Sequence, residues 1–348
     1  MPPGCLAARR AQQAVIPEKH LFLRRGIVIM FGLTGINSGE RLNMRNMIAV
    51  FGHRGARGLA PENTLAGFRL ASCLGLTGVE FDVGMTADNV PVVHHDARLH
   101  PDIARNESGV YAGADAPLIR ALTYQQLATY DVGRLRPGSA YARRYPGQQA
   151  QDGERIPTLA KVLTTCASLD LLVEIKTAPD RPDITHTPSE LVEQVSRVLG
   201  AAKSSENAGL IAFDWRVLDV AARRAPSLRR GCLTDANTVC QARLWFGDSR
   251  LDAHEPEKPG SVPRTVASTG AVIWAPDHKT ITEADIAEAR RLGLAVIPWT
   301  VNDPDDIQRM IELRVDGMIS DVPDQAKAMI AARGIALAAP GFVSRLRM

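Results

Sequence analysis

Residues 51–96 read FGHRGARGLAPENTLAGFRLASCLGLTGVEFDVGMTADNVPVVHHD. This stretch contains the pair His53 and Arg54, the acids Glu80 and Asp82 two positions apart, and a His-His-Asp triplet at 94–96. Each of these polar groups stands beside a short apolar run. A purely structural segment has little use for so many polar side chains in this setting, so the composition indicates a functional site.

Outward from this stretch, short β-branched runs alternate with amphipathic segments. Such alternation predicts parallel strands connected by helices. The predicted strands are residues 47–51, 78–83, 171–175, 209–213, 230–233, 271–274, 294–298 and 316–320. The predicted helices are residues 65–74, 157–166, 189–201, 217–225, 282–292, 304–313 and 323–332.

Eight such units have the size of a closed (β/α)8 TIM barrel of the α/β class. The alternative is an open doubly wound sheet, which usually carries a glycine-rich phosphate loop after its first strand. Here His53-Arg54-Gly55 follows the first strand instead. The sequence therefore favours the barrel.

The barrel is predicted to span residues 47–333, between an N-terminal extension at 1–46 and a C-terminal tail at 334–348. An extended run at 90–94 suggests a hairpin-like arm after the second strand. Periodicity then weakens over 97–156, which we interpret as a small inserted subdomain. Within it, a helix is expected over 118–130, with Thr123 as a candidate N-cap.

Composition excludes several classes of protein. The 348 residues are 45% hydrophobic with a net charge of +3, which is too mild to indicate nucleic-acid binding. Five scattered cysteines without a C-x-x-C pair argue against a disulfide framework or a zinc cage. No apolar run reaches the roughly 18 residues that span a membrane. Residues 26–36 faintly resemble a signal peptide but lack a cleavage site, so a cytoplasmic protein is expected, with periplasmic or secreted as the alternative.

Polar residues follow several predicted strands, where the chemistry of barrel enzymes is located. Glu80 and Asp82 share one face of a strand, and so do Glu174 and Lys176. Three carboxylates brought together would repel one another unless a cation lay between them, and oxygen ligands suit Mg²⁺ or Ca²⁺. The alternative is an ion-pair network in which these acids bind Arg54 and Lys176.

His53 and His95 are candidates for general acid and base, because imidazole titrates near neutral pH. His94 alternates with His95, and strand parity alone does not say which of the two faces the site. Arg54 and Lys176 are suited to binding an anion.

Two further residues have an open role. Glu62 lies in the Pro-Glu-Asn-Thr segment, where Asn63 or Thr64 could cap the next helix and Glu62 could reach the site. Trp299 follows a predicted strand and either walls a pocket or packs at the rim.

Over residues 50–332 the chain resembles the glycerophosphodiester phosphodiesterases. Nine segments carry the resemblance: His-Arg-Gly-Ala (53–56), Pro-Glu-Asn-Thr (61–64), Glu-Phe-Asp-Val (80–83), Thr-Ala-Asp (86–88), Val-Val-His-His-Asp (92–96), Ile-Pro-Thr-Leu (156–159), Glu-Ile-Lys (174–176), Pro-Trp-Thr-Val-Asn (298–302) and Val-Asp-Gly (315–317). In this order they are highly specific, although any one alone is weak.

The resemblance implies a TIM barrel with a subdomain inserted after the second strand. It implies hydrolysis of glycerophosphodiesters to sn-glycerol 3-phosphate and an alcohol, with a nucleophile that is the substrate's own glycerol hydroxyl. The residue roles that it implies are acid–base catalysis by His53 and His95, one divalent cation held by Glu80, Asp82 and Glu174, phosphate binding by Arg54 and Lys176, and a substrate wall at Trp299.

Three departures from the family pattern concern Arg57, residues 98–101 and residues 211–213, none of which is expected to touch the metal or histidine set. A lysophospholipase D or related phospholipase acting on lipid phosphodiesters is one alternative. A non-catalytic phosphodiester-binding barrel is another. The expected partner is a small-molecule substrate, without nucleic acid or stable membrane insertion. The alcohol, the metal and the oligomeric state are not readable from the sequence.

Overall fold

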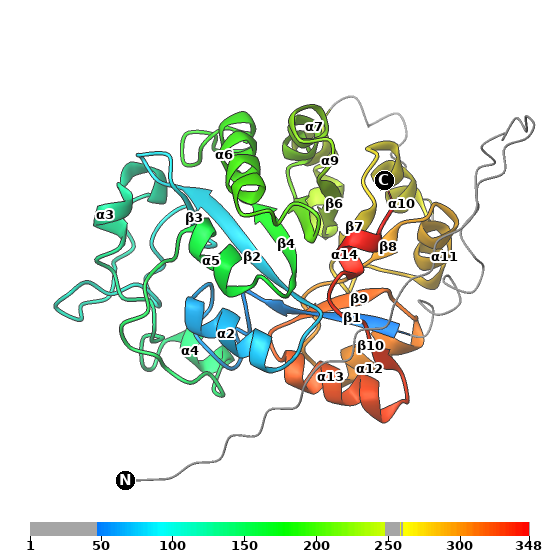
Figure 1. Ribbon diagram of the computed structural model, residues 1–348, viewed down its shortest axis with the longest axis horizontal. Coiled ribbons are helices and arrows are strands. Elements are labelled where there is room, and N and C mark those ends of the chain that lie inside the picture. The colour runs from blue at the N-terminus through cyan, green and yellow to red at the C-terminus, as the bar shows by residue number, and fades with distance from the viewer. Residues whose placement is uncertain (1–46, 248–257, 259, 348) are drawn as a thin grey trace, which may run out of the picture.

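The computed structural model describes residues 47–247, 258 and 260–347, so the predicted extension at 1–46 lies outside the described residues. Eight parallel strands form a barrel (Figure 1). They are β1 (Met47–His53), β2 (Gly78–Met85), β4 (Asp170–Ile175), β5 (Ala208–Ala212), β6 (Arg229–Thr234), β7 (Ile273–Pro276), β8 (Ala295–Val296) and β9 (Gly317–Ser320).

Strand pairing runs from β1 through β2, β4, β5, β6 and β7 to β8, and β9 pairs with β1 on its other side. Two backbone hydrogen bonds join the segments that contain β8 and β9, from Asp316 N to Val296 O (3.0 Å) and from Ile319 N to Pro298 O (2.9 Å). The predicted TIM barrel is therefore confirmed.

Helices cover the outer face of this barrel. The seven predicted ones are present as α2 (Leu65–Cys73), α5 (Leu159–Thr165), α6 (Pro188–Ala201), α7 (Trp215–Arg224), α11 (Glu283–Arg291), α12 (Pro304–Glu312) and α13 (Pro323–Ala332). Between β6 and β7 the chain also forms α8 (Ala236–Cys240), α9 (Ala242–Phe246) and α10 (Ser261–Ser268), which the periodicity did not predict.

The starts of these helices follow from local chemistry. Thr64 caps α2 by accepting a hydrogen bond from Gly67 N, so Thr64 rather than Asn63 is the cap. Thr187 and Glu190 form a capping box at α6, with Pro188 in the first turn.

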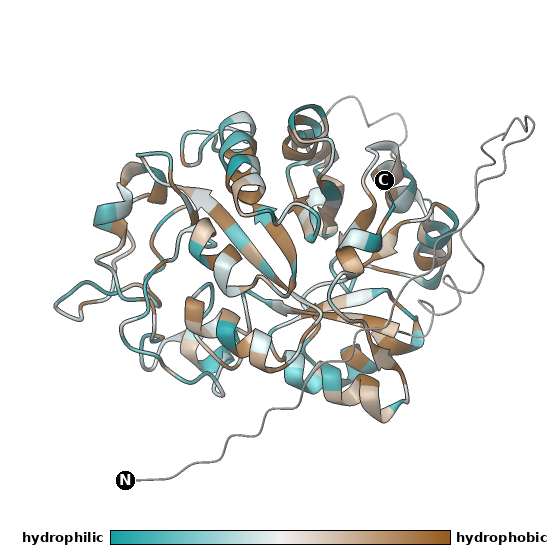
Figure 2. Ribbon diagram, viewed as in Figure 1, coloured by the Kyte–Doolittle hydropathy of each residue, from teal (hydrophilic) through white to brown (hydrophobic). Residues whose placement is uncertain are grey.

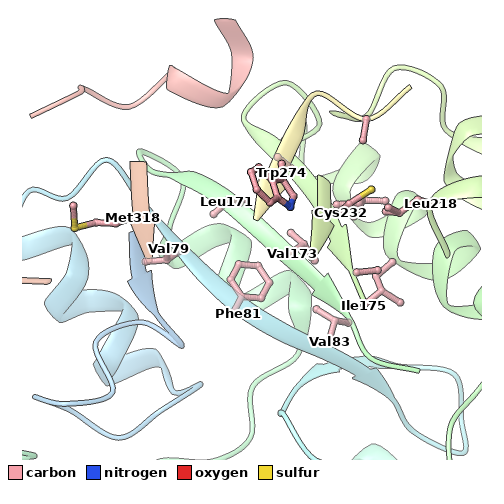
Figure 3. Packing of buried hydrophobic residues seen from close by; sticks show 14 of the residues in the cluster. Val79, Phe81, Val83, Leu171, Val173, Ile175, Leu218, Cys232, Trp274 and Met318 are labelled. Carbon is pink, nitrogen blue, oxygen red and sulfur yellow. The ribbon is translucent and has the colours of Figure 1, made fainter. Parts of the chain in front are cut away.

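Alternation along the strands separates two environments. On β2, Val79, Phe81 and Val83 face the helices and join the outer core (Figure 3). Glu80 and Asp82, between them, consequently point into the barrel. Figure 2 shows the same division, with hydrophobic residues on the helix faces that contact the sheet.

The C-terminal segment closes the bottom of the barrel. β10 (Ala336–Leu337) extends the sheet beside β1, and α14 (Phe342–Arg345) places Phe342 against Phe51, with ring centroids 6.3 Å apart. Asp170 accepts hydrogen bonds from Gly341 N (2.8 Å) and Val343 N (2.9 Å). This apolar floor leaves the opposite end, where the strands terminate, as the open mouth.

The inserted segment after β2 begins with β3 (Pro91–Val93), which pairs antiparallel with β2 as predicted. It continues through η1 (Ile119–Ala121), α3 (Tyr124–Leu127) and α4 (Ala140–Arg144), gathered on one side of the barrel (Figure 1). The helix predicted over 118–130 is wrong as one element, because Leu122 is extended (ψ 140°). Thr123 then caps α3.

Candidate active site

A tight loop after β1 presents His53 and Arg54 to the mouth. Arg54 has a positive φ of 50° and Gly55 one of 91°. A Cβ on Gly52 would lie 1.8 Å from the Gly55 carbonyl oxygen, so only glycine fits there. A non-glycine residue in the left-handed region is strained, and such strain concentrates at functional sites.

Three carboxylates meet inside the barrel. Glu80 and Asp82 come from β2 and Glu174 from β4, where Asp82 and Glu174 are register partners. One oxygen of each lies within 4.8 Å of the others, and all three residues are buried. The structure therefore brings together the predicted metal ligands.

The ionisation of these acids is strongly perturbed. Burial, with the charges of Asp82 and Glu174, raises the pKa of Glu80 well above its usual range. Burial also raises the pKa of Glu174. Burial opposes ionisation of Asp82 as well, but Arg54, His95 and Lys176 hold its pKa well below the usual value. The cluster is thus unfavourable without a neighbouring positive charge.

The predicted cations lie beside these acids. Arg54 Nη1 donates to Glu62 Oε1 (2.8 Å), and its Nε lies 3.2 Å from Asp82 Oδ2. Lys176 Nζ donates to Glu174 Oε1 (2.6 Å) and lies 3.5 Å from Asp82 Oδ1. The ion-pair network expected as the alternative is therefore also present.

The network does not balance the charge. Glu62, Glu80, Asp82 and Glu174 are four carboxylates facing the two cations Arg54 and Lys176, which leaves two negative charges when all are ionised. In addition, Asp82 Oδ1 is buried without a hydrogen-bond partner. An all-oxygen set with two uncompensated charges fits a divalent cation such as Mg²⁺ or Ca²⁺.

Each of the two candidate histidines forms a hydrogen bond with a carboxylate through Nδ1. His53 Nδ1 lies 2.7 Å from Asp321 Oδ1, and its Nε2 lies 3.7 Å from Glu80 Oε2. His95 Nδ1 lies 2.6 Å from Asp96 Oδ1. These bonds leave Nε2 of both rings as the nitrogen available to a substrate.

Burial lowers the pKa of both histidines in the substrate-free protein. Burial, with the charge of Arg57, lowers the pKa of His53. Burial, with the charges of Lys176 and Arg54, lowers the pKa of His95 to about 4. His94 faces away from the cavity, with its Nε2 3.1 Å from Arg98 O.

A cavity of about 360 Å³ joins these groups at the mouth. The predicted site residues that line it are His53, Arg54, Glu80, His95, Glu174, Lys176 and Trp299. Asp82 and Glu62 lie beneath its surface. Trp299 packs edge-on against Phe213, with centroids 5.3 Å apart, and its Nε1 donates to Ala275 O (2.8 Å).

Arg57 and Tyr141 contact the site but were not among its predicted residues. Arg57 forms a two-pronged ion pair with Asp321 (2.8 and 3.0 Å), and its Nη2 lies 3.1 Å from His53 Nδ1. The expectation that the departures avoid the histidine set is therefore wrong for Arg57. Tyr141, from α4, donates its hydroxyl to Glu62 Oε2. The sequence signal for Arg57 was its departure from the family pattern. No sequence feature indicated Tyr141.

Glu62 has both carboxylate oxygens engaged, one by Arg54 and the other by Tyr141. Its neighbour Asn63 donates from Nδ2 to Asp82 Oδ2 (3.0 Å). Residues 62–64 thus combine a helix cap with two contacts to the site.

A closed barrel with this polar mouth defines the chain as an enzyme of the TIM-barrel class. The chain belongs to the glycerophosphoryl diester phosphodiesterase family, whose sequence model matches residues 53–325. It is accordingly a phosphoric diester hydrolase.

Known proteins agree with this assignment. A solved structure from Silicibacter pomeroyi DSS-3, named "Putative glycerophosphoryl diester phosphodiesterase", is 33% identical, with a TM-score of 0.76 over 85% of this chain and 98% of that chain. The glycerophosphodiester phosphodiesterase of Caldanaerobacter subterraneus subsp. tengcongensis is 27% identical over 79% of this chain and 94% of its own length. A phosphodiesterase of Oleispira antarctica shares the fold at 22% identity, with a TM-score of 0.61 over 82% of this chain and 97% of that chain.

Proposed function

We propose that this enzyme hydrolyses glycerophosphodiesters to sn-glycerol 3-phosphate and an alcohol, using one divalent cation and the histidines His53 and His95. The observation that carries the proposal is the meeting of three buried carboxylates with two carboxylate-bonded histidines at one cavity. The Oleispira antarctica phosphodiesterase was solved in complex with the product sn-glycerol-3-phosphate, which supports this substrate class. The catalytic unit would be the barrel of residues 47–333 with its insertion at 97–156.

Glu80, Asp82 and Glu174 would hold the cation, which when bound neutralises charge on the phosphoryl oxygens. Arg54 and Lys176 line the same cavity and would bind the phosphate as a fork and a point charge. The carboxylates that pair with Arg54 and Lys176 hold both side chains in place before substrate binds, which reduces the free-energy cost of orienting them.

The histidines would move the protons. One, as the neutral ring, would take a proton from the nucleophile at Nε2, and the other, protonated on both nitrogens as an imidazolium, would give its Nε2 proton to the leaving alkoxide. Asp321 and Asp96 hold the Nδ1 protons, so each ring keeps the tautomer in which Nε2 faces the substrate. The nucleophile is proposed to be the glycerol hydroxyl, which would give a cyclic phosphate that water then opens.

Water-soluble diesters are favoured over lipids by the surface around the mouth. His100, Tyr141 and Arg144 line the cavity on the side of the insertion. Within the described residues, Val110 is the one large hydrophobic side chain that is exposed.

The test is hydrolysis of glycerophosphocholine and of lysophosphatidylcholine, with and without EDTA, followed by addition of Mg²⁺ or Ca²⁺. We expect activity on glycerophosphocholine that EDTA abolishes and metal restores. Activity confined to the lysolipid would instead select the lysophospholipase D alternative. Binding of either compound without turnover would select the non-catalytic barrel.

A further inference from the structure

The insertion builds one wall of the cavity from His100, Tyr141 and Arg144. The ring of His100 lies 4.7 Å from that of Tyr141, which meets Tyr145 edge-on at 5.2 Å. The guanidinium of Arg144 lies 5.9 Å from the centroid of each tyrosine ring. Two packed aromatic rings therefore hold a cation at the rim of the cavity.

Arg144 differs from the other cations of the cavity in its charge balance. The others are each paired with a carboxylate: Arg54 with Glu62 at 2.8 Å, Arg57 with Asp321 at 2.8 Å, and Lys176 with Glu174 at 2.6 Å. Arg144 contacts aromatic rings, and no carboxylate among the described residues pairs with it. It is the cation of this cavity whose charge the described residues leave uncompensated.

The aromatic faces in this wall are already used by cations of the protein. Arg57 lies over the ring of Tyr145 at 4.8 Å, and Arg144 lies near Tyr141 and Tyr145. A quaternary ammonium such as choline requires open aromatic faces without a competing cation. The wall therefore offers no open aromatic face for a positively charged alcohol.

A glycerophosphodiester has three parts, and they do not share charge equally. The phosphate is proposed to lie at the carboxylate cluster with Arg54 and Lys176. The glycerol part is uncharged, so a further cation can select only a charge on the alcohol. We propose that Arg144, which lies against Tyr141 and Tyr145, binds an anionic group on the alcohol part, so that the enzyme prefers diesters whose alcohol carries a phosphate or carboxylate. This inference rests on the proposed function.

The experiment uses substrate pairs that differ by one anionic group. Glycerophosphoglycerol is compared with bis(glycerophospho)glycerol, whose alcohol carries a phosphodiester. Glycerophosphoethanolamine is compared with glycerophosphoserine, whose alcohol carries a carboxylate. The first pair reports a phosphate-type anion and the second a carboxylate. The kcat/KM ratio within each pair is measured for the full chain and its variants over a range of salt concentrations.

We expect the anionic member of at least one pair to be preferred by roughly tenfold at low salt, beyond the statistical factor of about two for the symmetric bis-diester. Arg144→Gln should remove most of that preference, and salt should weaken it in the unchanged protein. Arg143→Gln is the matched control, because Arg143 stands next to Arg144 on α4 but donates to Gly138 O instead of lining the cavity.

Three results would overturn the inference. In the first, Arg144→Gln leaves both ratios as they are. In the second, it lowers kcat/KM equally for every diester, which would place Arg144 at the shared phosphate. In the third, the unchanged protein prefers the uncharged or positively charged alcohols. If the unchanged protein hydrolyses no glycerophosphodiester, the proposed function itself fails, and that outcome is distinct from the other three.

Discussion

His53 Nδ1 lies 2.7 Å from Asp321 Oδ1, which joins the end of β1 to the residue after β9 across the closing seam of the barrel. Asp321 also accepts hydrogen bonds from Nε and Nη2 of Arg57. Because Nδ1 donates to this carboxylate, the Nε2 lone pair of His53 is directed at the cavity. Asp321 is therefore a positioning residue for the proposed catalytic histidine.

Replacing Asp321 with Asn should lower kcat by about 100-fold, the size of one general acid–base contribution, because the amide no longer enforces the tautomer of His53. KM should change little. Steady-state kinetics on a glycerophosphodiester measures both. Asp306→Asn is the matched control, since Asp306 accepts from His278, which does not line the cavity. Equal loss in the two variants would contradict the positioning role.

The same variant should also change stability with a defined pH dependence. Burial opposes ionisation of Asp321, but His53 and Arg57 hold its pKa far below the usual value. The unfolded state therefore binds the proton more readily, so the stabilisation is present above about pH 4 and is lost as the pH falls further. Asp321→Asn should cost about 3 kcal/mol at pH 7, because it leaves Arg57 buried without its partner.

Urea unfolding at pH 7 and at about pH 3 measures this difference in the free energy of unfolding. The difference in the free energy of unfolding between the unchanged protein and Asp321→Asn should be smaller at the lower pH. A gap that is constant with pH would mean that the Asp321 carboxylate is not the stabilising charge.

Glu80→Gln should stabilise the metal-free protein while it abolishes activity. Burial beside Asp82 and Glu174 raises the pKa of Glu80, so its ionised form is unfavourable in the fold at neutral pH. We expect a gain of about 1 kcal/mol without metal, in line with other relieved active-site strain. Added Mg²⁺ or Ca²⁺ should raise the melting temperature of the unchanged protein more than that of the variant.

Asp170→Asn is the control for that measurement. Its carboxylate also has a pKa raised by burial, but it lies at the floor of the barrel and accepts from Gly341 and Val343. This variant should keep the full response to metal. An equal response of the Glu80 variant would remove Glu80 from the proposed ligand set.

Tyr141→Phe should lower kcat/KM by roughly three- to tenfold. The Tyr141 hydroxyl donates to Glu62, which in turn holds Arg54 at 2.8 Å. One lost hydrogen bond of this kind is worth about 1 kcal/mol. Tyr145→Phe retains the ring against which Arg57 lies and should have near-normal activity. An effect of the same size in both variants would argue for a loss of packing instead.

The pH profile should show an acid limb below pH 6.5. Burial, with the charge of Arg57, lowers the pKa of His53 from 6.5, so the neutral imidazole persists as the pH falls below that value. A bound cation would lower the pKa further. The measurement is kcat/KM between pH 5 and pH 9 at saturating metal. An acid limb centred above pH 7 would contradict a neutral His53.

Much of the site was already determined by local pattern. Alternation along β2 forces Glu80 and Asp82 onto the inner face, because Val79, Phe81 and Val83 must contact the helices. The same period directs Glu174 inward from β4. Side-chain parity is a property of the backbone, so it can be predicted from sequence once the strand is recognised.

Irregular segments were predicted poorly. Over 118–130 the chain offers helical spacing, yet an extended Leu122 separates η1 from α3. The insertion has its own small core, built from Leu99, Ile103, Leu127, Val132 and Ile156 among others. Packing of those side chains, not helical period, selects the backbone there.

The sequence by itself predicted the barrel and the inward direction of Glu80, Asp82 and Glu174, because strand and helix periods are short-range properties. The family resemblance, carried by short motifs, added His53 and His95. Only the tertiary structure decided that Arg57 and Asp321, 264 positions apart, both contact His53. It also decided that the Tyr141 hydroxyl donates to Glu62. Such contacts depend on the path of the closed sheet and of the insertion over its mouth. Those paths are set by the packing of the whole core, which no local pattern encodes.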